Sequence, residues 1–136
     1  MDSNLLRWAI IVLLLAHGIG HIMGFLESWT SIPMGFTNQP SLLSNRVTID
    51  STVGRAFGLL WLIAMIAFLG AMFGLVARQE WWRTLAIAAA LISLMAILPW
   101  WYTVTAGARW GAVLVNAAIL LALLPTWGEQ IARSIR

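Results

Sequence analysis

The chain has 136 residues, of which 61% are hydrophobic and only 10% are charged, and its mean hydropathy is +0.88. A soluble domain needs roughly a quarter of charged residues to cover its surface, so this composition excludes a soluble globular protein and indicates an integral membrane protein. The formal net charge is +3, but all eight basic residues are arginines that lie between the apolar runs, which is typical of membrane-flanking charge and not of a nucleic-acid surface.

The first apolar run, Leu5–Phe25, is long enough to cross a bilayer core, which takes about 20 helical residues. A short charged start before an apolar run also occurs in signal peptides. Here, however, no A-x-A cleavage pattern follows, and the run exceeds a typical signal-peptide core. We therefore expect this helix to be retained. Near its end, the stretch "AHGIGHIMGF" holds two histidines, His17 and His21, four residues apart.

A long polar connection, residues 26–55, follows the first run, and loops of this length are usually functional or flexible. Three further apolar runs are separated by short connections, so successive helices must return as antiparallel neighbours. These predicted spans are Ala56–Ala77, Thr84–Tyr102 and Trp110–Trp127. The sequence predicts an all-α fold, in which residues 1–136 form one transmembrane domain. Its helices make an up-down-up-down four-helix bundle with a long outer loop between the first and second helices.

The arginines in the short flanks predict the orientation. One side of the membrane would hold Arg7, Arg78, Arg83, Arg133 and Arg136, and the other would hold Arg46, Arg55 and Arg109. The positive-inside rule then places both termini in the cytoplasm and the long loop outside. Most tryptophans are expected at the interfaces, with Trp8, Trp81, Trp82 and Trp127 at the inner one and Trp29, Trp100, Trp101 and Trp110 at the outer one.

Polar side chains within the predicted spans fall at one level. At about 1.5 Å per residue, His17 lies roughly 12 Å and His21 roughly 6 Å below the outer end of the first helix. Trp61, Ser93 and Asn116 fall in the same outer half. Because polar groups in a bilayer turn towards the bundle interior, we expect these five residues to converge on a ligand pocket covered by the long loop. His17, the deeper histidine, is expected to meet Asn116 or Trp61 across the bundle.

The histidine spacing leaves three uses open: hydrogen bonding between helices, proton handling or substrate polarisation, and metal or haem ligation. Residues four apart share a helix face, so both imidazoles can aim at one point. Zinc usually takes three or four protein ligands, and a third would have to be Glu27 or Asp50, which His21 is better placed to meet. Both histidines cannot ligate opposite faces of one haem, but either could be a single axial ligand. With no cysteine in the chain, thiolate sites, disulfides and iron–sulfur clusters are excluded.

Three pairs of glycines spaced by four residues are typical of close helix packing. The pairs are Gly20 with Gly24, Gly54 with Gly58, and Gly70 with Gly74. Because three pairs exceed what one four-helix bundle needs, we expect a homo-oligomer or another membrane-protein partner besides the lipid bilayer.

The run "AHGIGHIMGF", together with "GRAFGLLWLIAMIAFLGA" and "GARWGAVLVNAAILLALL", resembles small bacterial four-helix membrane proteins with an H-G-x-x-H-x-x-G-F signature, a layout loosely similar to DoxX-type proteins. The matching residues are His17, Gly18, His21, Gly24, Phe25 and Asn116, whereas Gly20 stands where bulkier residues are commoner. The resemblance covers most of the chain except the first loop. It implies a bacterial inner-membrane protein of four helices and does not imply a particular activity.

Two classes of function stay open. In the first, the protein is a non-enzymatic module that binds a small apolar or amphipathic ligand, or a membrane partner, in the outer pocket. In the second, it is a membrane enzyme or redox subunit that uses His17 and His21 on a lipid-soluble substrate such as a quinone or isoprenoid, or as metal or haem ligands. The helices contain neither paired carboxylates nor a Ser-His-Asp set, which favours the first class.

Overall fold

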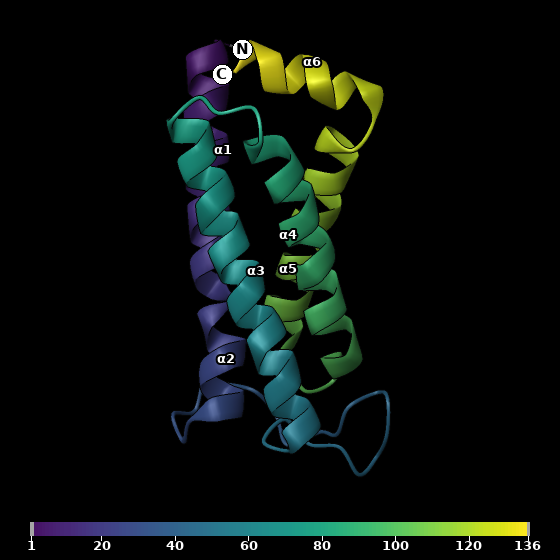
Figure 1. Cartoon of the computed structure of the whole chain (residues 1–136). Helices are drawn as coiled ribbons and strands as arrows, with labels where there is room; N and C mark the ends of the chain where they lie inside the picture. The colour runs from purple at the N-terminus through teal and green to yellow at the C-terminus, as the bar shows by residue number, and fades with distance from the viewer. Residues whose placement is uncertain (1, 136) are drawn as a thin grey trace.

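The computed structural model describes residues 2–135, which form a helical bundle (Figure 1). Its helices are α1 (Ser3–Gly20), α2 (Ile22–Trp29), α3 (Thr52–Val76), α4 (Trp82–Ile97), the short 3₁₀ helix η1 (Leu98–Trp100), α5 (Ala106–Leu123) and α6 (Thr126–Ser134). Four segments are long and apolar enough to cross a membrane, namely α1 with α2, α3, α4 with η1, and α5. The predicted all-α fold with four candidate membrane spans is confirmed.

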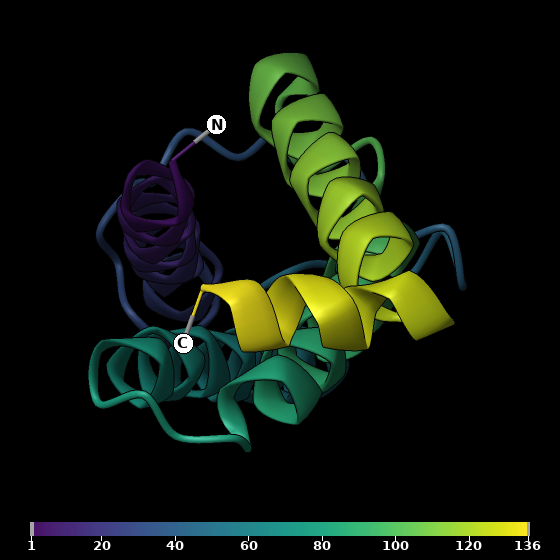
Figure 2. The same ribbon diagram turned by 90° about the horizontal axis from the view of Figure 1, so that it is seen from above.

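The four spans are arranged in the order α1, α3, α4, α5 around the bundle. Helix α3 packs against α1, α2 and α4, and α4 packs against α5. Figure 2 shows α1 and α5 standing apart on either side of this arrangement. Both termini lie at one end of the bundle, here called the terminal end, and the connection of residues 30–51 lies at the other, the loop end (Figure 1).

The first span is interrupted at His21, between α1 and α2. The backbone N–H of His21 donates to the carbonyl of Gly18 (3.1 Å), three residues back. In a regular α-helix it would donate to the carbonyl of His17, four residues back. That carbonyl instead accepts a hydrogen bond from Nδ1 of the His21 side chain (2.8 Å). Gly20, which has a low helix propensity, immediately precedes the interruption.

The last predicted span, Trp110–Trp127, is displaced in the structure, because α5 runs from Ala106 to Leu123. Pro125 then begins α6, which lies across the terminal end of the bundle (Figures 1 and 2). A proline cannot donate the backbone hydrogen bond that would continue α5. Helix α6 buries Gly128 and Ala132 against the bundle, so the short amphipathic C-terminal segment is part of the fold.

Two apolar clusters divide the interior. The terminal-end cluster consists of Ile11, Leu14, Phe68, Ala71, Leu75, Trp82, Ala86, Ala89, Ala90, Ile119, Leu123, Ala132 and Ile135, and the loop-end cluster consists of Trp61, Ala96, Ile97, Trp100 and Val104. Along α4, Ser93 falls between Ala90 of the first cluster and Ala96 of the second. His17 and Asn116 occupy the corresponding level in α1 and α5. A layer of polar side chains therefore separates the two clusters.

Two of the tryptophans expected at the membrane interfaces are buried in the core. Trp82 and Trp100 are both 0% exposed, and each belongs to one of the two apolar clusters. Their positions near the ends of α4 suggested the interfaces, but α4 is the span that packs against both α3 and α5, so both of its ends are covered. Other tryptophans near the helix ends are largely exposed: Trp8, Trp29, Trp81, Trp110 and Trp127.

Most of the paired glycines pack within the chain. A Cβ atom added at Gly24 would collide with the ring of Trp61, and one added at Gly58 would collide with the side chain of Ser28. Gly54 meets loop carbonyls, Gly70 meets Leu85, and Gly74 meets Trp81 and Trp82. These contacts join α2 to α3 and α3 to α4. Gly20 is different, because an added Cβ there would meet nothing within 4 Å.

The long connection is fixed to the segment that joins α4 to α5. The carbonyl of Pro99 accepts from the backbone N–H of Leu42 (2.8 Å) and the hydroxyl of Ser41 (3.0 Å). Further along, the backbone N–H of Thr37 donates to the carbonyl of Thr103 (2.8 Å). These hydrogen bonds hold the neighbouring Phe36 over the loop end of the bundle.

Candidate functional site

Four polar side chains at the level between the two clusters form a hydrogen-bonded circuit. Nε2 of His17 bonds to the side-chain oxygen of Asn116 (3.1 Å), and Nδ2 of Asn116 donates to the hydroxyl of Ser93 (2.7 Å). The same hydroxyl bonds to Nε2 of His21 (2.6 Å), whose Nδ1 bonds to the backbone carbonyl of His17 (2.8 Å). The circuit therefore links α1, α5 and α4 and returns to α1.

One proton on each imidazole gives the circuit a single direction. Nδ1 of His21 must donate, because a backbone carbonyl only accepts, so Nε2 of His21 accepts from the hydroxyl of Ser93. That hydroxyl accepts from the amide of Asn116, whose oxygen accepts from Nε2–H of His17. These tautomers are assigned from the network, as histidine tautomers ordinarily are.

The assignment leaves one ring nitrogen uncommitted. Nδ1 of His17 is an acceptor that has no hydrogen-bond partner in residues 2–135. This atom is not fully buried. The ring itself is held edge-to-face against His21 (centroids 4.8 Å apart) and against Phe68 (4.8 Å). His17 therefore presents a fixed, unpaired acceptor.

A cavity of about 200 Å³ adjoins the circuit at the loop end. Its lining includes His17, Gly20 and His21 from the first span, Trp61 from α3, Phe36 from the loop, and Ala108 and Ala112 from α5. Apart from the two histidines and the indole N–H of Trp61, the described residues that line it are apolar or glycine. Such a shape, an apolar chamber with few polar groups, is typical of small-molecule sites.

Trp61 forms one wall of the cavity. Its ring is 3% exposed, lies directly on the backbone of Gly24, and is flanked edge-to-face by Phe36 (centroids 5.7 Å apart). Trp61 therefore lines the predicted pocket but takes no part in the hydrogen-bonded circuit. Only a glycine at position 24 allows this approach.

The structure brings the predicted site residues together in two roles. His17, His21 and Trp61 line the cavity, whereas Ser93 and Asn116, both 0% exposed, lie behind the histidines and bond to them. The predicted contact between His17 and Asn116 is confirmed. The lining residues Phe36, Ala108 and Ala112 were missed, because loop contacts and small side chains leave no chemical signature in the sequence.

The expected contact of His21 with a carboxylate is wrong. Glu27 accepts from the backbone N–H of Met34 (2.5 Å), and Asp50 lies exposed in the loop, where a hydrogen bond from Thr48 holds the pKa of its carboxyl below the usual value. No group of three or more His, Asp or Glu side chains among the described residues is arranged to hold a metal ion. Hydrogen bonds engage both nitrogens of His21, so His17 Nδ1 is the ring nitrogen left for any ligand.

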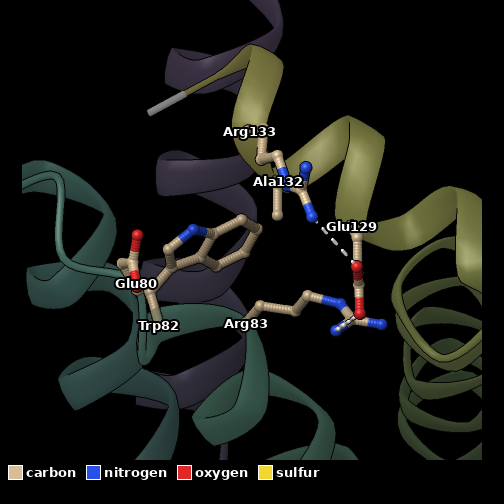
Figure 3. A pocket seen from close by; sticks show the side chains of 6 residues that line it. All are labelled: Glu80, Trp82, Arg83, Glu129, Ala132 and Arg133. Atoms are coloured by element: carbon tan, nitrogen blue, oxygen red, sulfur yellow. Dashed lines mark hydrogen bonds and ion pairs between the residues drawn. The ribbon is translucent and has the colours of Figure 1, made fainter.

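A second, larger hollow of about 520 Å³ lies at the terminal end, beneath α6 (Figure 3). Contacts of Arg83 join α4 to α6 and to the end of α5. Glu129 pairs with Arg83 (3.7 Å) and Arg133 (3.2 Å), and Nε of Arg83 also donates to the carbonyl of Leu123 at the end of α5 (2.9 Å). Pairs with exposed partners contribute little stability, so this hollow is best explained as the seam under a surface helix.

Comparison with known proteins gives no relative: no protein-family model, no curated protein and no solved structure matches the chain.

Proposed function

We propose that this protein is a multi-pass membrane protein that binds one small apolar or amphipathic molecule in the cavity next to His17 and His21. The observation that carries the proposal is the cavity itself, whose walls are apolar and whose polar end is formed by two imidazoles fixed by a complete hydrogen-bonded circuit. Buried polar networks are costly within a bilayer unless every member is satisfied. Here every side-chain nitrogen and oxygen atom of the network has a hydrogen-bond partner except Nδ1 of His17.

We propose the bacterial inner membrane as the location of this protein. Residues 17–25, several of which line the cavity, resemble the signature of small bacterial four-helix membrane proteins, and the arginine distribution favours the inner membrane with both termini in the cytoplasm. In that orientation the cavity lies in the outer half of the bilayer. A homo-oligomer or membrane partner remains part of the same proposal.

Binding is favoured over catalysis by the composition of the cavity. General acid–base or redox work on a lipid-soluble substrate needs a proton donor and acceptor, or a cofactor, positioned at the reacting atoms. Among the described residues that line the cavity, the two histidines are the only titratable ones, and His21 is fully engaged in hydrogen bonds. Retention of a ligand requires no more than the cavity provides.

Photolabelling of the purified protein in lipid nanodiscs tests the proposal. The probe is a 12-carbon alcohol that carries a diazirine in mid-chain, and labelled peptides are identified by mass spectrometry. We expect labels on α1–α2 and on the first half of α5. Gly20→Phe should abolish them, because position 20 lines the cavity and an added Cβ meets nothing.

Gly111→Phe is the matched control. An added Cβ at Gly111 also meets nothing within 4 Å, but this residue does not line the cavity, so labelling should persist. Equal labelling of the wild-type protein and Gly20→Phe would show that the probe reads the bilayer-facing surface, and the proposal would be withdrawn.

A further inference from the structure

The cavity is too small for a whole lipid. Its volume of about 200 Å³ lies below the roughly 300–1,000 Å³ of sites that enclose a drug-sized ligand. A ligand with a longer apolar chain must therefore leave most of the chain outside. The polar end of the ligand is the part that fits next to His17 and His21.

One side of the cavity lies between α1 and α5. The lining residues on this side are small and exposed, namely Ala16 and Gly20 on α1 and Ala108 on α5. Helices α1 and α5 are not among the extensively packed pairs of the described structure, and Figure 2 shows them apart. In a bilayer this side faces the hydrocarbon chains, where an apolar tail is as stable as it would be within the protein.

We infer that the ligand is a single-chain amphiphile with a hydroxyl group, an alcohol or a phenol, which donates a hydrogen bond to Nδ1 of His17 while its apolar chain passes between α1 and α5. This inference rests on the proposed function and adds the chemical class of the ligand. It follows from the direction of the circuit, which commits the three other imidazole nitrogens and leaves an acceptor towards the cavity.

A hydroxyl group fits this acceptor, and groups without a donor do not. An ether, ester or ketone oxygen would meet the lone pair of His17 Nδ1 with lone pairs of its own, so this nitrogen would stay unpaired. A hydroxyl also reproduces the hydrogen bond that a water molecule would give to this nitrogen, whereas an ether that displaces the water does not.

The test compares two competitors of the diazirine probe that have the same number of heavy atoms, 1-dodecanol and 1-methoxyundecane. On the wild-type protein, we expect the alcohol to suppress labelling at a concentration about two- to tenfold lower than the ether, which is what one neutral hydrogen bond provides. His17→Phe keeps a ring against Phe68 but removes the acceptor. In this variant the two competitors should act at equal concentrations.

The outcomes separate the inference from the proposed function. Failure of both competitors and of the probe on the wild-type protein overturns the proposed function. Equal competition on the wild-type protein overturns only the hydroxyl inference, and so does an alcohol preference that survives in His17→Phe. A preference for the alcohol that disappears in this variant supports both.

Nitrogen NMR of the wild-type protein provides a readout that needs no variant. With ¹⁵N-labelled histidine, we expect an unprotonated Nδ1 for His17 and a protonated Nδ1 for His21, in accordance with the circuit. A protonated Nδ1 on His17 would make the cavity-facing nitrogen a donor and would overturn the inference. The same competition with farnesol and its methyl ether tests isoprenoid chains. Comparison with 1-dodecanol then shows whether the site prefers an isoprenoid alcohol or a straight-chain alcohol.

Discussion

Replacing Ser93 with alanine removes the hydroxyl group through which the circuit passes. This hydroxyl accepts from Asn116 (2.7 Å) and bonds to His21 (2.6 Å), and its residue is 0% exposed. The substitution therefore breaks two hydrogen bonds between helices while removing a single atom, so its effect is not confused by a large cavity.

The size of the effect depends on whether the amide of Asn116 and Nε2 of His21 find new hydrogen-bond partners. Hydrogen bonds between membrane helices average about 0.6 kcal/mol and reach about 1.7 kcal/mol, and a buried group left unpaired costs about 1–3 kcal/mol. His21 borders the cavity, where water can replace the lost hydroxyl, but the amide of Asn116 is 0% exposed. We therefore expect Ser93→Ala to lower the free energy of unfolding by about 2 kcal/mol.

Ser28→Ala is the matched control, since Ser28 is also buried but its hydroxyl donates to Gly24 within its own helix (2.8 Å). Its loss should change the free energy of unfolding by less than about 0.5 kcal/mol, because the hydroxyl competes with an existing helix hydrogen bond. Both variants are measured by equilibrium unfolding in mixed micelles with increasing SDS, followed by circular dichroism. If Ser93→Ala costs no more than Ser28→Ala, the circuit does not stabilise the bundle.

Three other outcomes are expected. Gly24→Ala should lower the midpoint of the same unfolding transition, because the new Cβ displaces Trp61. Gly20→Ala should leave the midpoint unchanged or raise it, and similar shifts for both variants would refute the role of Gly24 in packing. Arg7→Met should cost about 1 kcal/mol in that assay, since the guanidinium donates to the carbonyl of Val76 (2.8 Å) at the end of α3, and an unchanged midpoint would show that this contact is dispensable. Reporter enzymes fused to the C-terminus should be active only in the cytoplasm, and an external C-terminus would overturn the predicted orientation.

The sequence predicts the spans well because about 20 apolar residues have few alternatives in a membrane protein. It also predicts the contact of His17 with Asn116, since their depths match and polar groups in a bilayer seek one another. The partner of His21 could not be predicted, because the interruption of the first span turns its side chain back to the carbonyl of His17 and across to Ser93. Depth counting assumes a regular helix and does not show such a turn.

The sequence also does not show which faces of the helices are buried and which are exposed. Trp82 and Trp100 stand where interface tryptophans are common, and only the packing of α4 between its neighbours shows that they are core residues. Helix α6 was missed because its few apolar residues give no span signal, yet a proline at its start and a small buried face suffice to place it across the bundle.

The two helices on either side of the opening beside His17, α1 and α5, differ in how firmly they are packed. On one side, the first span is fixed to α3 by the contacts of Gly18, Gly24 and Gly58. On the other, the first turns of α5 contain Gly107 and Gly111, whose surroundings are empty, and glycine within a helix costs about 0.5–1 kcal/mol relative to alanine. Entry and exit should therefore be timed by the fraying of this part of α5, and its amide hydrogens should exchange with solvent deuterium sooner than those of α2.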